Sequence, residues 1–312
     1  MLARSRAGYN GRRVHRTSCV ASLLLTLVVF APAAAFAQFG RPPALNAEAV
    51  LLIDPAGKVI YAKNADNERA PASLVKLMTL YLACEDLETG RADVDEIVSV
   101  SHHAATVARY RMGLRTGEQV PLHVLLEGVA IASANDAATA LAERLGGDEA
   151  TFVQRMNDKA RDLGLNGTRF ANPHGLPDPL QRSNAHDLAE LTGRLLRDYP
   201  MSRTLLGGQT FIYNGRVYAR HIPLFNDPGG VQALKTGFTN EAGYNLAVSA
   251  WRGGQQFVMI VLGSRTRALS FLDAKKLLRY GFVETGLDAP EPEKPARPAP
   301  RKPVRARRTS SP

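Results

Sequence analysis

Runs of residues with strand character stand near both ends of this chain, and helical patterns fill the middle. The apolar runs 49–53 and 59–62, separated by turn residues at 55–58, predict a hairpin. Three more runs of this kind predict strands at residues 234–238, 244–250 and 257–262. We therefore expect an α+β fold, in which both ends of the chain build one antiparallel sheet and a helical subdomain is inserted between them.

The middle of the chain shows apolar residues at helical spacing. After Ser73 they recur every three to four positions, which predicts a helix that begins near this serine. Further helical patterns cover residues 122–164, 187–196 and 270–280. The first of these patterns is broken at 133–135 and at 146–147. A functional site is expected in the cleft between the sheet and the helical insertion.

The first 37 residues have the order of a secretory signal peptide. A basic leader without acidic residues precedes an apolar run at 20–29 and small residues that end at Ala37. This pattern predicts export across the cytoplasmic membrane with a cut after Ala37, and a periplasmic or cell-envelope location. The alternative is an uncleaved membrane anchor, although Pro32 interrupts an apolar stretch that is already short for a span. Residues 38–44 read as a linker, and residues 45–286 as one folded domain.

Basic charge is concentrated at the ends of the chain. Of the formal net charge of +10, the leader carries +5 and residues 287–312 carry +4, so the body is nearly neutral. A near-neutral body argues against nucleic acid as a partner. Residues 287–312 are rich in proline, alanine and arginine and predict a disordered basic tail. The alternative to a purely solvated tail is weak contact with anionic lipid or wall polymer.

Cysteine and histidine residues indicate no metal or disulfide framework. Cys19 lies in the predicted signal peptide, so the mature chain keeps only Cys84, which is expected to be a buried, inert thiol. The histidines lack metal-ligand spacing, and a structural role is expected for each. His174 is the best exception because its loop is expected to border the cleft. We expect neither a metal nor a cofactor.

Three short motifs carry the candidate chemistry, and the first is Ser73-Leu74-Val75-Lys76. Ser73 and Lys76 lie three positions apart at a helix start, so they share one face. A serine needs a neighbour that accepts its proton, and a lysine can do this only when it is neutral. Burial and a second cation, for which Lys235 is the candidate, both favour the neutral amine. The alternative is a helix-capping serine followed by a solvated lysine.

The other two motifs are Ser133-Ala134-Asn135 and Lys235-Thr236-Gly237. Ser133 and Asp136 fit a helix capping box, which would hold the serine and Asn135 rigidly above the cleft. Lys235 and Thr236 lie on a predicted strand and could meet a carboxylate. Gly237 lacks a side chain, so a ligand backbone could approach this strand and pair with it. The alternative is an ordinary strand glycine beside a surface lysine.

Together the motifs resemble the Ser-x-x-Lys, Ser-x-Asn and Lys-Thr-Gly set of penicillin-binding proteins and serine β-lactamases. Residues 45–286 are similar to the low-molecular-mass D-alanyl-D-alanine carboxypeptidases of peptidase family S11. The longer segments that carry this resemblance are 133–138, 156–157, 170–176, 235–239 and 242–246. It implies the transpeptidase fold of penicillin-binding proteins, peptidoglycan stem peptides ending in D-Ala-D-Ala as substrate, and β-lactams as covalent inhibitors.

The resemblance also implies a role for each motif residue. Ser73 would carry the acyl ester, Lys76 would accept its proton, and Ser133 would relay a proton to the leaving D-alanine. The implied oxyanion hole consists of the backbone amides of Ser73 and Phe238. The substrate-binding residues that it implies are Asn135, Lys235, Thr236, Gly237, Phe238 and Arg220.

This chain departs from the family pattern at two positions. Phe238 stands where well-known relatives have histidine, which leaves a backbone role intact. Ser270 falls where some relatives have a carboxylate-binding arginine. Either Arg265 or Arg267 substitutes for it, or Lys235 and Arg220 suffice. The all-β domain and anchor helix of the best-known members are not recognisable after residue 286.

The sequence leaves three functions in competition. The resemblance favours a DD-carboxypeptidase that removes the terminal D-alanine during cell wall biogenesis. A DD-endopeptidase would cleave peptide crosslinks with the same residues. A non-catalytic peptidoglycan-binding protein would not need the intact Ser73, Lys76, Ser133 and Lys235. No Glu-x-x-Leu-Asn segment lies between residues 133 and 235, so slow release of bound penicillin is expected.

Overall fold

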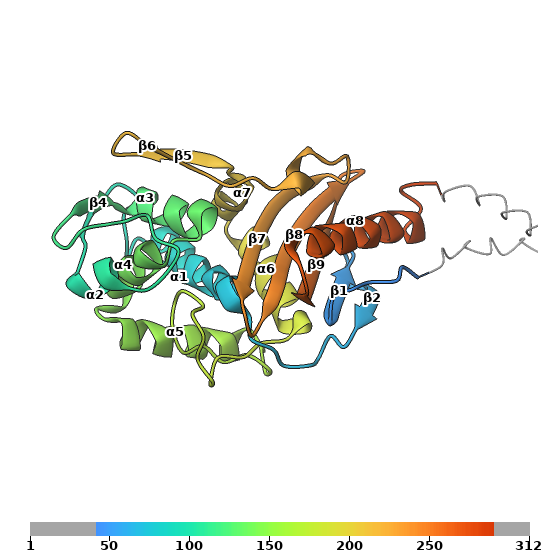
Figure 1. Ribbon diagram of the computed structural model, residues 1–312, viewed down its shortest axis with the longest axis horizontal. Coiled ribbons are helices and arrows are strands. Elements are labelled where there is room, and N and C mark those ends of the chain that lie inside the picture. Colours follow the sequence, from blue (N-terminus) through green and yellow to red (C-terminus); the bar gives the residue numbers. More distant parts are fainter. Residues whose placement is uncertain (1–41, 290–312) are drawn as a thin grey trace, which may run out of the picture. The chain divides into compact units, whose positions relative to one another are not determined.

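The central sheet is assembled from strands at both ends of the described chain, as the strand patterns predict. The computed structural model describes residues 42–289, so the predicted signal peptide and residues 290–312 lie outside it. The sheet is antiparallel, with strand order β2-β1-β9-β8-β7 (Figure 1). Its strands are β1 (Ala49–Ile53), β2 (Val59–Lys63), β7 (Val231–Thr239), β8 (Gly243–Arg252) and β9 (Gln255–Ser264). The predicted architecture is therefore confirmed.

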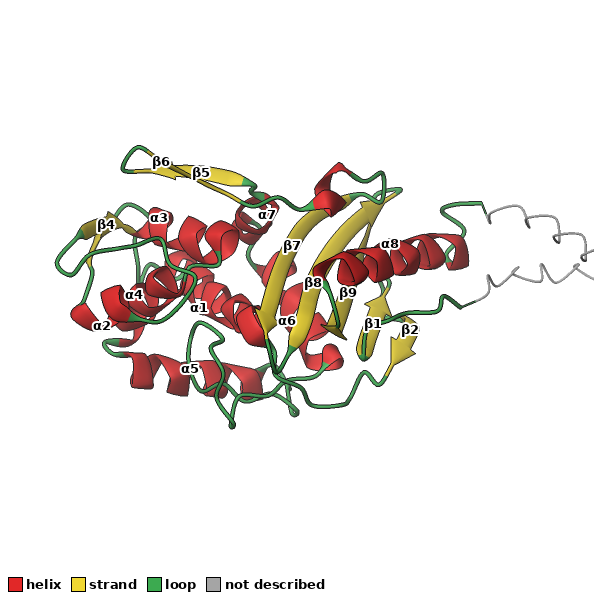
Figure 2. Ribbon diagram, viewed as in Figure 1, coloured by secondary structure: helices red, strands yellow, loops and turns green. Residues whose placement is uncertain are grey.

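Helices cover both faces of this sheet because alternate strand residues are apolar on both sides. In β1, Leu51 joins the core shared with the helical insertion, whereas Val50 and Leu52 join a second core beneath α8 (Arg267–Glu284). Phe282 of α8 meets the ring of Phe257 of β9 edge to face at 5.2 Å between centroids. Figure 2 shows α8 across one face of the strands and α6 (Ala185–Asp198) behind the other.

The helical insertion follows the predicted pattern closely. The 3-10 turn η1 (Ala72–Val75) leads directly into α1 (Lys76–Glu88). The predicted breaks near residues 133 and 146 separate three consecutive helical segments. These segments are α3 (Leu122–Glu127) with the π-helical turn η2 (Gly128–Ala132), α4 (Asn135–Gly146) and α5 (Glu149–Asp162).

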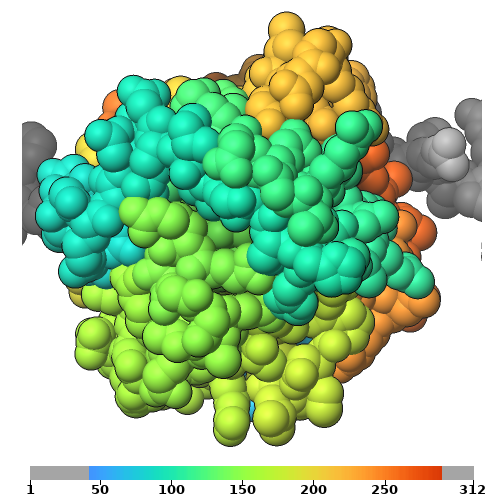
Figure 3. Space-filling view, turned by 90° about the vertical axis from the view of Figure 1, so that its left-hand side faces the viewer, coloured from blue at the N-terminus to red at the C-terminus, as the bar shows by residue number. Residues whose placement is uncertain are grey.

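Several short elements have no counterpart in the sequence-based expectations. They are α2 (His102–Thr106), α7 (Met201–Gly207), the 3-10 turn η3 (Pro223–Asn226), the pair β3 (Ile97–Ser99) and β4 (Gln119–Pro121), and the hairpin β5 (Thr210–Tyr213) and β6 (Arg216–Ala219). Figure 3 shows this hairpin, in gold, beside the cyan and green surface of the insertion. Its two-residue turn, Asn214-Gly215, has positive φ at both residues, a strong hairpin signal.

The folded body continues beyond the predicted boundary at residue 286. The Leu287 amide donates to the carbonyl of Phe282, and the carboxylate of Asp288 pairs with Arg252 at 2.5 Å. These two residues, placed in the predicted tail, therefore belong to the body.

Cys84 is buried, and burial raises the pKa of its thiol to about 12, which suits an inert residue. Within residues 42–289, no helix is long and apolar enough to span a membrane, and no cluster of potential metal ligands occurs.

Candidate active site

The side chains of Ser73 and Lys76 meet at the floor of the cleft. The Nζ atom of Lys76 lies 3.2 Å from Oγ of Ser73 and 2.7 Å from Oδ1 of Asn135, and it also donates to the carbonyl of His174. Lys76 has no exposed surface. Burial lowers the pKa of its amine to about 7, against the opposing effect of the Asp136 carboxylate. A substantial fraction of this amine is therefore neutral near pH 7.

Two close backbone approaches position Ser73. Gly237 of β7 packs against η1 so tightly that a Cβ on it would lie 3.0 Å from the Ser73 amide nitrogen. A Cβ on Gly175, which has φ +89°, would lie 2.1 Å from the carbonyl oxygen of Ala72. Gly237 therefore allows η1, the turn that carries Ser73, to pack closely against β7. The sequence analysis expected this glycine only to let a ligand approach the strand. The side-chain amide of Asn245 also donates to the carbonyl of Pro71 at 3.2 Å.

Ser133 and Lys235 form the second polar pair of the cleft. The Nζ atom of Lys235 donates to Oγ of Ser133 at 2.7 Å and to the Thr236 carbonyl at 3.0 Å. Burial, followed by the charges of Lys76 and Arg220, holds the pKa of Lys235 well below its usual range. Lys235 was expected to lower the pKa of Lys76 as a second cation. Burial lowers that pKa instead, and the charge of Lys235 is not among its causes.

The predicted capping box at Ser133 is wrong. The N-cap of α4 is Ala134, without a side-chain hydrogen bond, and Ser133 ends η2 in a left-handed conformation with φ 55°. Its hydroxyl is turned to Lys235 instead. The buried carboxylate of Asp136 accepts from the amides of Met112, Gly113, Leu114 and Ala137 at 2.8–3.1 Å. Asp136 thus holds the loop at residues 112–114 in place. The sequence analysis did not predict this role because it interpreted Asp136 as part of a helix cap.

The amide group of Asn135 is occupied within the protein. Its Oδ1 accepts from Lys76, and its Nδ2 donates to the carbonyls of Ala108 at 3.0 Å and Arg109 at 3.1 Å. Its backbone amide donates to the Tyr110 carbonyl at 2.8 Å. Asn135 therefore clamps the 108–110 loop over the cleft, a contact that the sequence did not indicate.

Arg220 lies beside the cleft, as expected, but most of its donors are bonded to backbone. Its guanidinium donates to the carbonyls of Gly208, Ala130, Leu234 and Leu206. Burial lowers its pKa to about 10. Since four of its five N–H groups are used in this way, Arg220 ties η2 to β7, the elements that lead to Ser133 and Lys235.

The cleft has two halves that meet at Ser73, Tyr110 and Phe238. The half of about 530 Å³ is lined by four motif residues and two arginines, namely Ser133, Lys235, Thr236, Gly237, Arg220 and Arg267. The half of about 330 Å³ is lined by Asn135 and by residues of the 108–110, 174–177 and 238–241 segments. All predicted site residues except Lys76 therefore line this cleft, and Lys76 contacts Ser73 and Asn135 of the lining from a fully buried position.

The sequence left open whether Arg265 or Arg267 takes the place of the arginine that Ser270 replaces, and the structure distinguishes these two residues. Ser270 is fully buried, and its hydroxyl donates to the Arg267 carbonyl at 2.8 Å. Arg267 lines the larger half of the cleft, held by a bond to the His221 carbonyl at 2.6 Å, and Arg265 does not line it. His174 borders the cleft, and burial lowers the pKa of its imidazole to about 3, so its ring is neutral.

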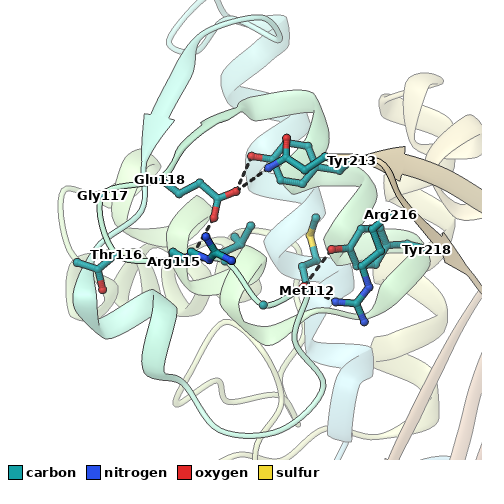
Figure 4. A pocket seen from close by; sticks show the side chains of 11 residues that line it. Met112, Arg115, Thr116, Gly117, Glu118, Tyr213, Arg216 and Tyr218 are labelled. Atoms are coloured by element: carbon teal, nitrogen blue, oxygen red, sulfur yellow. Dashed lines mark hydrogen bonds between the residues drawn. The ribbon is translucent and has the colours of Figure 1, made fainter.

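A separate cavity of about 610 Å³ lies between the 112–118 loop and the β5–β6 hairpin (Figure 4). The hydroxyl of Tyr213 donates to Glu118 at 2.8 Å, and that of Tyr218 donates to the Met112 carbonyl at 3.0 Å. None of the motif residues lines this cavity. These contacts dock the hairpin that leads into Arg220.

Comparison with known proteins agrees with this arrangement. The family model for D-alanyl-D-alanine carboxypeptidases, peptidase family S11, matches residues 37–266, which include all three motifs. The chain belongs to this S11 family. The resemblance seen in the sequence is therefore confirmed, and with it the assignment to a family of serine hydrolases.

Curated S11 relatives are 29–37% identical to the chain over the aligned residues. It is 34% identical to D-alanyl-D-alanine carboxypeptidase DacF of Bacillus subtilis, with 88% of this chain and 72% of the relative covered. It is 37% identical to DacC of Escherichia coli, with 82% and 66% covered, so about a third of that relative has no counterpart. A D-alanyl-D-alanine endopeptidase of Escherichia coli is 29% identical and is covered over 91% of its length, with 89% of this chain.

Solved structures of penicillin-binding proteins share the S11 fold seen here. Penicillin-binding protein 5 of Haemophilus influenzae is 34% identical, with a TM-score of 0.75 and 78% of this chain and 72% of that chain covered. Penicillin-binding protein D2 of Listeria monocytogenes, in its ampicillin-bound form, is 31% identical with a TM-score of 0.68 and 78% and 100% covered. The predicted transpeptidase fold is thereby confirmed.

Proposed function

We propose that this protein is a serine-type DD-carboxypeptidase that removes the terminal D-alanine from peptidoglycan stem pentapeptides through an acyl-enzyme on Ser73. The observation that carries the proposal is the contact at 3.2 Å between the Ser73 hydroxyl and a buried amine whose pKa is about 7. Such an amine accepts a proton near neutral pH, which an exposed lysine does not.

The reaction proceeds in two halves. Lys76 takes the proton of the Ser73 hydroxyl while Oγ attacks the carbonyl carbon of the penultimate D-alanine. The backbone amides of Ser73 and Phe238 stabilise the oxyanion. A proton passes through Ser133 to the leaving amine as the C–N bond breaks, and D-alanine departs. Water then hydrolyses the ester and restores the serine.

The larger half of the cleft suits the terminal carboxylate of the substrate. Lys235 and Thr236 face it from β7, and a bound carboxylate would raise the pKa of Lys235 toward the charged form. Arg267 is the arginine placed to join them, since Ser270 is buried and Arg220 is engaged by backbone carbonyls. Both arginines add positive potential to this half.

Two measurements test the proposal. Mass spectrometry after exposure to penicillin is expected to show one adduct on the Ser73 peptide, which persists because release is slow. Incubation with a pentapeptide that ends in D-Ala-D-Ala is expected to release D-alanine, and Ser73→Ala is expected to lose both signals. An unmodified Ser73 peptide would instead indicate a non-catalytic peptidoglycan-binding protein.

A second candidate is a DD-endopeptidase, which cuts crosslinks with the same residues. The specific observation in its favour is the Escherichia coli endopeptidase, whose length this chain covers to 91%. Its lower identity, 29% against 34–37%, favours the carboxypeptidase. Purified crosslinked and uncrosslinked muropeptides, supplied in equal amounts, separate the two by which substrate is consumed first.

We also propose that the protein acts in the periplasm or cell envelope after removal of residues 1–37. The basic leader and the start of the family match at residue 37 support this boundary. In this arrangement residues 38–44 link the mature N-terminus to the domain. Sequencing the N-terminus of the protein from a periplasmic extract tests the cut.

A further inference from the structure

The smaller half of the cleft shares Ser73 with the larger half, and Lys235 lines only the larger one. If the substrate carboxylate lies near Lys235 and the scissile carbonyl lies at Ser73, the acyl part of the peptide must extend into this half. An extended peptide advances about 3.3–3.6 Å per residue, so the residue before D-Ala-D-Ala reaches this cavity. This placement of the peptide rests on the proposed carboxypeptidase function.

The lining of this cavity combines apolar side chains with two opposite charges. Leu176, Pro177 and Phe238 form the apolar part, which suits a chain of methylene groups. Arg109 and Glu241 supply one positive and one negative charge from separate segments. A volume of about 330 Å³ is sufficient for one long side chain.

Arg109 is presented by a strained and firmly held loop. Arg109 and Tyr110 have φ values of 51° and 38°, which are uncommon for residues with side chains. The bonds from Asn135 to the carbonyls of Ala108, Arg109 and Tyr110 impose this conformation. Strain that the surroundings enforce is concentrated at functional sites. Within residues 42–289, the exposed guanidinium of Arg109 has no hydrogen-bond or ion-pair partner.

Glu241 is held in the lining of the cavity by Arg182. Arg182 donates to one of its carboxylate oxygens at 3.1 Å and also bonds to the Gln181 carbonyl at 2.8 Å. The Glu241 side chain remains 49% exposed, so its carboxylate can still accept from a ligand. An ammonium group is the natural partner for such a carboxylate.

We propose that this cavity selects stem peptides in which the residue before D-Ala-D-Ala is a diamino acid with both an ammonium and a carboxylate at the end of its side chain. Glu241 binds the ammonium, and Arg109 binds the carboxylate through its planar fork of donors. Leu176 and Phe238 contact the methylene groups between them. Arg109 is then a specificity-determining residue.

Two matched peptides test this assignment, each with an acetylated residue X followed by D-Ala-D-Ala. In one, X is meso-2,6-diaminoheptanedioate, and in the other X is lysine, which lacks the terminal carboxylate. We expect the kcat/KM for D-alanine release to be about tenfold higher for the first peptide. Arg109→Ala is expected to bring this ratio close to one, and Arg109→Lys to leave it between the two. Glu241→Gln should lower kcat/KM for both peptides about equally.

The control removes a comparable charge outside the cleft. Arg115 is exposed and lines the cavity beside the hairpin, so Arg115→Ala is expected to keep the tenfold ratio. Penicillin acylation followed by mass spectrometry shows whether Ser73 stays reactive in each variant. Equal kcat/KM values for both peptides in the unmodified enzyme, or an unchanged ratio in Arg109→Ala, would overturn the inference. Absence of D-alanine release from either peptide would instead overturn the proposed function.

Discussion

The amine of Lys76 and the hydroxyl of Ser73 are 3.2 Å apart, and the amine is completely shielded from solvent. The short distance follows from a local arrangement, because Ser73 lies in η1 and Lys76 opens α1. A three-residue spacing at a helix start brings side chains together without tertiary help. Burial, which is a tertiary effect, then supplies the low pKa that lets the lysine act as a base.

The pH dependence of acylation follows from this pKa. Below about pH 7 Lys76 becomes protonated and cannot accept the proton of Ser73. We expect the rate of acylation by a chromogenic β-lactam to fall about tenfold per pH unit there and to level off above it. Lys76→Ala should lose about 10²–10⁴-fold in rate, together with the inflection. A rate that stays constant from pH 5 to 9 would contradict this role.

Gly237→Ala should impair acylation more than it impairs folding. The added Cβ would lie 3.0 Å from the Ser73 amide and 3.1 Å from the Pro71 carbonyl, so η1 must shift away from β7. We expect the acylation rate to fall by about 10²-fold, since the amide belongs to the proposed oxyanion hole, and a loss of about 1–3 kcal/mol in unfolding free energy. Gly193→Ala, inside α6 with open space around it, is the control and should be neutral or stabilising.

Most of the fold could be predicted because its signals are local. Period-2 and helical patterns located all five strands of the main sheet and the long helices, with errors of a few residues at the ends. The short elements were missed because β3, β4, α2 and α7 have too few residues for a periodic pattern. The β5–β6 hairpin was also missed, although Asn214-Gly215 is a typical hairpin turn, because no strands were predicted on either side of it.

The sequence predicted contacts within a short motif, but contacts between distant segments of the site could not be derived from it. Ser73 and Lys76 are close in sequence, so their contact could be foreseen. The bond from Lys235 to Ser133 spans 102 positions and depended on the family resemblance. Asp136 was misread because a carboxylate three residues after a serine looks like a cap. The clamp of Asn135 on the 108–110 loop left no local pattern at all.

Asp136→Asn should separate an electrostatic effect from a structural one. The carboxylate raises the pKa of Lys76, so its removal should move the inflection of the acylation profile to lower pH. Four backbone amides now donate to the two carboxylate oxygens of Asp136, and an asparagine side chain would offer them only one acceptor oxygen. We expect the unfolding free energy, measured in urea, to drop by about 2–4 kcal/mol. An inflection that moves to higher pH would exclude the electrostatic effect.

Arg220→Lys should act through position rather than charge. Lysine keeps the cation but cannot reproduce four bonds to carbonyls on separate segments, including those of Ala130 and Leu234. Urea unfolding is expected to show a loss of about 2–3 kcal/mol, and kcat/KM for D-alanine release should fall about tenfold or more. Arg161→Lys, at an exposed pair on α5, is the matched control and should change stability by less than about 0.5 kcal/mol. Equal effects of the two variants would show that the carbonyl bonds of Arg220 have no special importance.

Arg267→Ala tests which arginine meets the substrate carboxylate. Arg267 shares the larger half of the cleft with Lys235 and Thr236, so its removal should weaken binding of the ground state and the transition state alike. For a peptide that ends in free D-Ala-D-Ala, we expect KM to rise about 5–20-fold while kcat changes less than about threefold. A peptide with an amidated C-terminus lacks the charge and should show no such rise. Arg265→Ala removes the same charge two residues away, outside the lining of the cleft, and should leave KM within about twofold. If both variants raise KM equally, the effect comes from overall positive potential, and Lys235 with Thr236 is sufficient for carboxylate binding.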